Sequence, residues 1–192
     1  MGKKKKAEEQ KPRTVEAIMA EGRAVIWNRE AGQKMFEEEY TGKWKEDRLE
    51  LALVEAMLLL EQGRITIKDG EGREMDADDF KAFASKKDQR FLNRYAVYKD
   101  LRSRNLPTRT GFKFGTDFRV YDRGVKPLQR GPKSAKEHTK WIVFAVAEGY
   151  TFSFPELSRA VRLAHNIRAN MLWAVVSETN EVHYYQVTFF KP

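Results

Sequence analysis

The stretch WIVFAVA, from Trp141 to Ala147, is apolar at every position and predicts the centre of a sheet. An apolar run without alternation is typical of a strand that is buried on both faces. Pro155 follows where the first turn of a helix tolerates proline, and residues 156–171 are predicted to be helical. The runs LWAVVS (172–177) and VHYYQVTFF (182–190) predict two further strands joined by an acidic turn. This mixture of strands and helices predicts an α/β layer with a central sheet.

The N-terminal half carries shorter signals. TVEAIM (14–19) and RAVIWN (23–28) predict a hairpin, because Ala20-Glu21-Gly22 between them favours a turn. LELALVEAMLLLEQG (49–63) predicts an amphipathic helix that ends at Gly63. RITIKD (64–69) alternates like a strand.

A second helix is predicted to begin near Asp79, capped by Asp76 or Asp78, and to run towards Leu101. A break in this helix is predicted at residues 85–88. We therefore expect a basic, disordered tail over residues 1–13, an N-terminal α/β domain over 14–85 and a C-terminal domain over 86–192.

Composition limits the class of protein. Of 192 residues, 41% are hydrophobic and 33% are charged, which is typical of a soluble globular protein. No apolar run reaches the length of a membrane span, and the N-terminus has no apolar stretch of the kind that a secretory signal needs. The chain has no cysteine, which excludes disulfides, zinc–thiolate sites and cysteine nucleophiles and suits a cytoplasmic location.

The charge is strongly positive. Lys and Arg number 36 against 28 Asp and Glu, giving a net charge of +8. This favours polyanionic partners, RNA or DNA before membranes. Half of the excess lies in residues 3–6 of the tail, so the charge alone does not decide the function.

Three segments carry a resemblance. They are YKDLRSRNLPTRTGFKFGTDFRVYDRG (98–124), KEHTKWIVFAV (136–146) and VRLAHNIRANMLWAVV (161–176). In this order and spacing the chain resembles the archaeal tRNA-splicing endonuclease family, closely from about residue 95 to the end and more loosely over 14–85. The resemblance implies an α/β (α+β) protein whose C-terminal domain has a restriction-endonuclease-like nuclease fold.

The family resemblance also implies an activity. It is the cutting of precursor tRNA at both intron boundaries of a bulge-helix-bulge, leaving 2′,3′-cyclic phosphate and 5′-hydroxyl ends without a metal or cofactor. The resemblance assigns deprotonation of the 2′-hydroxyl to Tyr121 and protonation of the leaving 5′-oxygen to His138. A histidine can donate a proton near neutral pH, whereas a tyrosine is a poor base unless cations lie near it. Arg119 and Arg123 flank Tyr121 in the sequence.

Ala169 departs from the family pattern. The resemblance places a lysine there, on the final helix, to stabilise the charge of the transition state. Arg168 and Asn170 are predicted to point to other helix faces, so neither is an obvious substitute. The alanine is either an introduced substitution or the natural residue of a protein that has lost the lysine. Such groups are commonly worth about 10²- to 10³-fold in rate, so we expect this chain to be severely impaired.

Two sets of residues are candidates for RNA binding. Arg162 lies seven residues before Ala169 and is predicted to share its helix face at about 10 Å. The resemblance gives this arginine a base-sandwiching role; the alternative is pairing with a nearby carboxylate. A basic, aromatic insertion resembles an extra loop of some crenarchaeal members and suits either RNA contact or plain solvation. It comprises Lys43, Trp44, Lys45 and Arg48.

The C-terminal strand suggests a partner subunit. VHYYQVTFF is too aromatic for an ordinary exposed edge, so it belongs to the core or pairs with another chain. The resemblance implies tail-to-tail pairing through this strand, and an acidic loop at 178–181 that docks in a basic pocket of a neighbour. An ordinary polar hairpin is the alternative for that loop. We expect a heterotetramer with a separate structural subunit.

Two other functions remain open from the sequence. Ala169 favours a non-catalytic structural subunit of the same complex, whereas Tyr121 and His138 oppose it. A non-catalytic RNA-binding module would need only the charge and the aromatic residues. A metal-dependent DNA nuclease is disfavoured, because no acidic cluster near FRVY (118–121) makes a two-carboxylate metal site.

Overall fold

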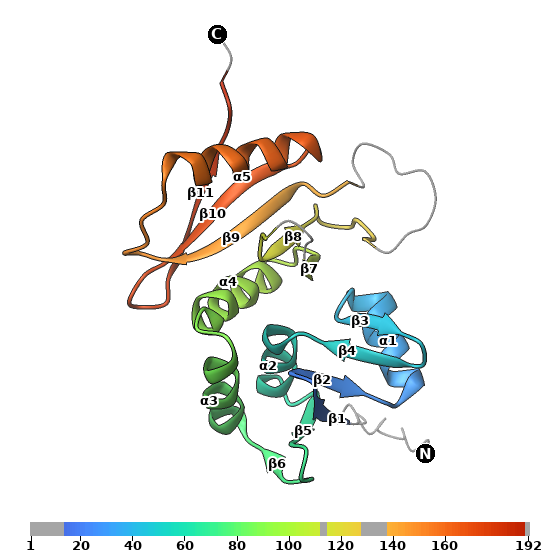
Figure 1. Cartoon of the computed structure of the whole chain (residues 1–192). Helices are drawn as coiled ribbons and strands as arrows, with labels where there is room; N and C mark the ends of the chain where they lie inside the picture. The colour runs from blue at the N-terminus through green and yellow to red at the C-terminus, as the bar shows by residue number, and fades with distance from the viewer. Residues whose placement is uncertain (1–13, 112–114, 128–137, 191–192) are drawn as a thin grey trace, which may run out of the picture.

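The computed structural model describes residues 14–111, 115–127 and 138–190, and these form two mixed sheets with five helices (Figure 1). The architecture is α+β, as predicted. None of the helices in these ranges is long and apolar enough to cross a membrane.

The N-terminal sheet has the strand order β3-β4-β2-β1-β5-β6. Only β1 and β5 run parallel; the other neighbours are antiparallel. Its strands are β1 (Val15–Ala20), β2 (Arg23–Ile26), β3 (Lys43–Lys45), β4 (Arg48–Leu51), β5 (Ile65–Lys68) and β6 (Glu74–Met75). The helices of this half are α1 (Arg29–Glu39), α2 (Leu53–Glu61) and α3 (Ala77–Lys87).

The C-terminal sheet has the order β11-β10-β9-β8-β7, with β9 and β10 parallel. Its strands are β7 (Thr108–Thr110), β8 (Phe118–Val120), β9 (Trp141–Ala147), β10 (Asn170–Val176) and β11 (Val182–Val187). Helices α4 (Phe91–Ser103) and α5 (Phe154–Asn166) lie on opposite faces of the sheet (Figure 1). Alternate residues of β9 therefore pack on the two faces. Val143 and Ala145 join the cluster that holds α4, while Ile142 and Val146 join the cluster under α5.

Helix α4 links the two halves of the chain. One continuous buried cluster runs from Ala17 in β1, through Tyr98 of α4, to Val176 in β10. The predicted break in the long helix is confirmed, since α3 ends at Lys87 and α4 begins at Phe91. The hairpin of β1 and β2 is confirmed as well, with Glu21 and Gly22 both at positive φ.

The predicted end of α5 was wrong. The helix stops at Asn166 rather than at residue 171, and Arg168 takes the left-handed conformation with φ 57°. The N–H of Ala169 donates to the carbonyl of Ala164 at 2.9 Å, and the N–H of Arg168 donates to that of His165 at 3.0 Å. This pair of bonds is a Schellman motif. Its left-handed position usually holds glycine. Here it holds Arg168, so the usual signal for the end of a helix is absent.

Residues 28–51 also differ from the prediction. Residues 29–39, for which no element was predicted, form α1, and Asn28 caps this helix by accepting the N–H of Ala31 at 3.1 Å. The segment LEL (49–51), predicted as the start of a helix, belongs to β4, and α2 begins only at Leu53. Helix α2 is buried on nearly all sides rather than amphipathic, because both α3 and α4 pack against it.

Candidate active site at one end of the C-terminal sheet

Three neighbouring strands bring the predicted catalytic positions 121, 138 and 169 to one edge of the C-terminal sheet, where the strands β8, β9 and β10 end or begin. Val120, the last residue of β8, pairs with Trp141, and Trp141 pairs with Asn170, the first residue of β10. Tyr121 directly follows this row, and Ala169 directly precedes it. His138 lies three residues before Trp141. The sheet register therefore gathers positions 48 residues apart in the sequence.

Lys140 is the residue that ties this edge together. Its backbone N–H donates to the carbonyl of Val120, and its own carbonyl accepts the N–H of Asn170, both at 2.9 Å. The amide side chain of Asn170 donates to the same carbonyl at 3.2 Å. Lys140 thus lies between the strand end that carries Tyr121 and the strand start that follows Ala169. Lys140 was not among the site residues predicted from the sequence.

Tyr121 is buried, with 4% of its surface exposed, and its backbone N–H donates to the carbonyl of Pro107 at 2.9 Å. Arg109, which stands opposite Arg119 in the β7–β8 pair, interacts electrostatically with Tyr121. Burial lowers the pKa of the Arg109 guanidinium, and the charge of the nearby Glu55 opposes that change. Arg123, expected beside Tyr121, instead donates to the carbonyl of Arg104 at 3.1 Å.

His138 and Ala169 complete the edge with different exposures. The His138 side chain is exposed at the first described residue after 127. Ala169 is half-buried in the Schellman turn. Because α5 ends at Asn166, Ala169 lies outside the helix, and the prediction that it shares a helix face with Arg162 was wrong. Arg162 itself is exposed on α5.

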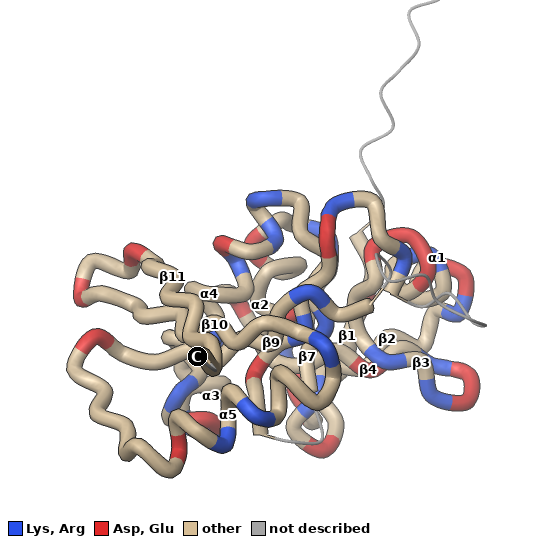
Figure 2. Tube along the Cα trace, turned by 90° about the horizontal axis from the view of Figure 1, so that it is seen from above, with Lys and Arg blue, Asp and Glu red and all other residues tan. Residues whose placement is uncertain are grey.

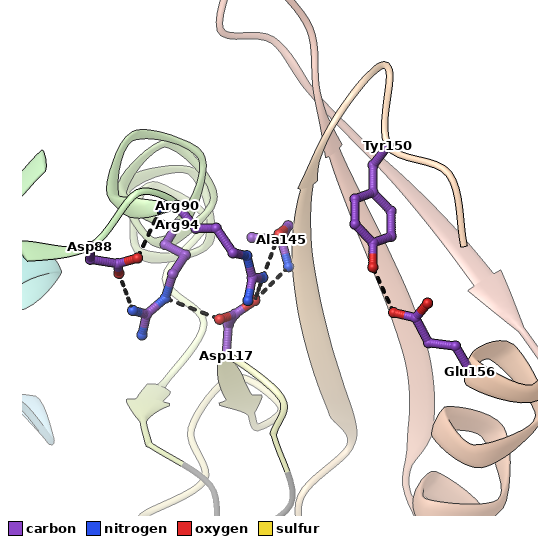
Figure 3. A network of polar contacts seen from close by, with 7 residues as sticks. All are labelled: Asp88, Arg90, Arg94, Asp117, Ala145, Tyr150 and Glu156. Carbon is purple, nitrogen blue, oxygen red and sulfur yellow. Dashed lines mark hydrogen bonds and ion pairs between the residues drawn. The ribbon is translucent and has the colours of Figure 1, made fainter. Parts of the chain in front are cut away.

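The opposite end of β8 is closed by an ion network around the buried carboxylate of Asp117 (Figure 3). The carboxylate of Asp117 lies 2.6 Å from the Arg90 guanidinium and 3.0 Å from Nε of Arg94, and it accepts the N–H of Ala145 at 2.8 Å. Arg90 also donates to the carbonyl of Ala145 at 2.7 Å, and Arg94 pairs with Asp88. This network fixes β8 against β9 and against the start of α4.

The basic, aromatic insertion is the β3–β4 hairpin rather than a loop. The Trp44 ring packs 6.3 Å from that of Phe36, and its indole N–H donates to the carbonyl of Glu46 at 3.1 Å. Lys45 and Arg48 both contact the carboxylate of Glu50, at 3.4 and 3.2 Å. Much of the hairpin's aromatic surface and charge is thus already engaged.

Lys43 and Trp27 are two exposed residues at this hairpin whose side chains could meet RNA. Lys43 is exposed at the start of β3. Trp27 is 52% exposed and carries the Arg48 guanidinium over its ring at 5.1 Å. Trp27, which the sequence analysis did not select, is therefore a more accessible indole than Trp44.

A basic cavity of about 540 Å³ lies between the two halves of the chain. Its charged lining is Arg23, Lys43, Arg94, Arg109 and Arg119 against Glu50 and Glu55. Glu55 is buried and accepts the N–H groups of Gly42 and Ala52 at 3.1 and 2.8 Å; burial raises the pKa of its carboxyl group. The turn between β10 and β11, in contrast, carries the acidic residues Glu178 and Glu181 (Figure 2).

Comparison with known proteins agrees with this arrangement. Residues 15–81 match the family described as tRNA intron endonuclease, N-terminal domain, and residues 91–184 match tRNA intron endonuclease, catalytic C-terminal domain. The chain is 36% identical over 177 residues to a tRNA-splicing endonuclease of Thermococcus onnurineus, covering 92% of this chain and 97% of that protein. It is 37% identical over 157 residues to one of Thermococcus kodakarensis, covering 82% and 87%.

A longer relative matches over part of its length. The tRNA-splicing endonuclease of Methanococcoides burtonii is 35% identical over 164 residues, which are 85% of this chain but 45% of that protein. The matches to the two domain families follow the chain in the same order as its two sheets. The chain therefore belongs to the tRNA intron endonuclease family.

Proposed function

We propose that this chain is an RNA-cleaving subunit of a tRNA-splicing endonuclease and that it uses Tyr121 and His138 for catalysis. The observation that supports the proposal is the strand register, which brings the backbone positions of Tyr121, His138 and residue 169 to the same edge of three hydrogen-bonded strands. Sites that are built on strand ends hold catalytic groups on a rigid support.

The chemistry needs three contributions at this edge. Tyr121 takes the proton of a ribose 2′-hydroxyl, and the 2′-oxygen attacks the adjacent phosphorus. The bond from phosphorus to the 5′-oxygen breaks, and His138 protonates that oxygen as it leaves. The products are a 2′,3′-cyclic phosphate and a 5′-hydroxyl. A positive charge near the phosphate stabilises the transition state.

Arg109 contributes a fixed positive charge to the surroundings of Tyr121. Its guanidinium interacts electrostatically with the tyrosine and donates from Nη1 to the carbonyl of Tyr40 at 3.0 Å.

The positive charge near the phosphate is missing at position 169, which holds alanine. Its methyl group carries no charge, so the chain as it stands should cleave slowly. The substrate we propose is a precursor tRNA with a bulge-helix-bulge, which the names of the relatives and the net charge of +8 support. Arg162, exposed on α5, and Lys43, exposed on β3, are the proposed RNA contacts; Lys45, Arg48 and Trp44 contribute less because of their intramolecular partners.

The test is cleavage of a bulge-helix-bulge RNA in EDTA by the chain and by its Ala169→Lys variant. We expect the lysine variant to cut about 10²- to 10³-fold faster and to leave cyclic phosphate. His138→Ala in the lysine background is the matched control and should remove that gain. Failure of the lysine variant to cut, alone or with a candidate partner subunit, would contradict the proposal.

A structural subunit is the second candidate function, and Ala169 is the observation that favours it. Such a subunit would gain no activity from Ala169→Lys, but it would raise the activity of a catalytic partner. Mixing the chain with a catalytic homologue from the same organism separates the two functions.

We propose that the chain assembles through its C-terminal strand and, in a heterotetramer, with a structural subunit. In the described ranges β11 pairs with β10 alone, and Tyr185, Phe189 and Phe190 are 59%, 72% and 82% exposed. An edge strand with exposed aromatic rings favours tail-to-tail pairing with a second chain. Phe189→Ser with Phe190→Ser should therefore lower the mass measured by light scattering; an unchanged mass would oppose this interface.

A second contact is proposed between the acidic turn of one chain and the basic cavity of another. Five cationic side chains line that cavity against two carboxylates, so an acidic segment is a complementary occupant. Glu178→Lys with Glu181→Lys should weaken assembly, and Arg23→Glu in the same chain should restore part of it. No recovery in the combined variant would oppose this pairing.

A further inference from the structure

We propose that Lys140 is a further cation of the cleavage site and that its ammonium group contacts the scissile phosphate. This inference rests on the proposed function, because it places a phosphate at the edge where Tyr121 and Ala169 meet. Lys140, directly before β9, would give this edge of the sheet a positive charge close to the uncharged position 169.

The backbone places Lys140 in the middle of the site. Its N–H and carbonyl bridge Val120 and Asn170, the neighbours of Tyr121 and Ala169. A side chain that starts from this residue begins between the two strands that flank β9. A lysine side chain is long enough to reach a phosphate on either side of its backbone.

The ammonium group of Lys140 is held loosely. Nζ lies 2.6 Å from the carboxylate of Asp122 and 4.4 Å from the centre of the Trp141 ring. The two side chains of the ion pair are 41% and 50% exposed. Exposed ion pairs of this kind contribute little stability. A phosphate can therefore displace Asp122 while the Trp141 face keeps the ammonium group in place.

Other cations near this edge are less suitable. Arg109 is committed to the carbonyl of Tyr40, and Arg123 to that of Arg104. Arg168 is the rival, because it is exposed and adjacent to Ala169 in the chain. Its left-handed backbone belongs to the Schellman turn at the end of α5, outside the row of paired strand residues. We therefore assign the phosphate contact to Lys140.

The experiment measures RNA binding, so it does not depend on cleavage. The ligand is a bulge-helix-bulge RNA with a 2′-deoxyribose at each cleavage site, which removes the nucleophile. Binding is titrated over a range of salt concentrations for the chain and for Lys140→Met. We expect severalfold weaker binding, and a log–log salt slope reduced in magnitude by about 0.7 to 0.9 for the lost contact.

A second RNA identifies the phosphate. It carries a neutral methylphosphonate at the cleavage site and is otherwise the same. Lys140→Met should leave the affinity for this RNA unchanged, because the contact has already lost its partner charge. Equal weakening on both RNAs would place the contact on another phosphate and overturn the assignment.

Lys68→Met is the matched control. Lys68 forms an ion pair with Glu16 at the same distance of 2.6 Å, but on the N-terminal sheet. It should change neither affinity nor slope. Arg168→Met tests the rival: if it alone shows the loss that depends on the methylphosphonate, the assignment to Lys140 is wrong.

Failure of this inference and failure of the proposed function are distinguishable. If Ala169→Lys does not cleave RNA, the proposed function fails, whatever the salt slopes. If Ala169→Lys cleaves but Lys140→Met binds both RNAs as the unaltered chain does, the function stands and the inference fails.

Discussion

The two ends of β8 differ in how their charges are held. At the beginning of the strand, Asp117 is 6% exposed as a side chain and is surrounded by two guanidinium groups and a backbone N–H. At its end, Asp122 is 50% exposed and pairs with the single ammonium group of Lys140. The two carboxylates are five residues apart, yet one is fixed inside the protein and the other meets solvent.

This difference separates structural from chemical roles. A buried carboxylate with satisfied partners holds its neighbours in one arrangement, and breaking such a set is costly. Exposed or weakly paired groups can exchange their partner for a substrate. We call the beginning of β8, at Asp117, the closed end and its last residues, towards Asp122, the open end. We expect substitutions at the closed end to change stability, and substitutions at the open end to change RNA cleavage or binding.

The largest effect is expected from His138→Ala at the open end. In the Ala169→Lys background, loss of the general acid should lower the single-turnover cleavage rate by about 10²- to 10⁴-fold. Because the His138 side chain is exposed, the melting temperature should not change. A fall in melting temperature with retained cleavage would reverse the distinction between the two ends.

At the closed end, Asp117→Ala should lower the free energy of unfolding by about 1–3 kcal/mol, because the N–H of Ala145 and the guanidinium groups of Arg90 and Arg94 lose their shared buried acceptor. Urea unfolding measures the change. Arg90→Met with Arg94→Met added to Asp117→Ala should recover part of the loss by removing the uncompensated charges. A change below about 1 kcal/mol for Asp117→Ala would mean that the network does not hold this end together.

The sequence predicted the features that depend on local signals. Asp76 caps α3 by accepting the N–H of Asp79 at 2.8 Å, and the apolar run 141–147 is β9. The strands on either side of residues 178–181 form the β10–β11 hairpin. Each of these is written in a few adjacent residues.

What the sequence could not predict depends on register or on an unusual residue. The end of α5 carries no glycine, since Arg168 occupies the left-handed position. Helix α1 is mostly polar and has Gly32 inside it, so its periodicity was weak, although Asn28 was an available capping signal.

Only part of the candidate site could be predicted, because the rest of it depends on the register of neighbouring strands. Tyr121 and His138 were selected from motifs, and the structure brings them to one sheet edge. Lys140 and Arg109 gain their significance only from the strands that lie beside them, and no pattern along the chain gives that register. The burial of Trp44 against Phe36 is likewise a tertiary contact.

Glu55 lies at neither end of β8, and its buried carboxyl group makes the stability of the protein depend on pH. Burial raises the pKa of Glu55 above its ordinary value of 4.5. The folded chain therefore holds this proton at pH values where the unfolded chain has lost it. As the pH rises from about 4.5 through the raised pKa, Glu55 should lower the free energy of unfolding. Glu55→Gln should flatten that part of a pH series of urea midpoints; an unchanged series would contradict the shift.

The smallest effect on stability is expected from Asp122→Asn at the open end. The exposed pair with Lys140 should contribute at most about 1 kcal/mol, so urea unfolding should change little. The affinity for RNA should rise, because the ammonium group of Lys140 no longer has to leave Asp122 before it can contact a phosphate. We expect somewhat tighter binding of the 2′-deoxy RNA at low salt, and the gain should vanish when Lys140→Met is added. A gain that survives Lys140→Met would come from the loss of a repulsive carboxylate alone, and Asp122 would then act on the RNA directly rather than through the lysine.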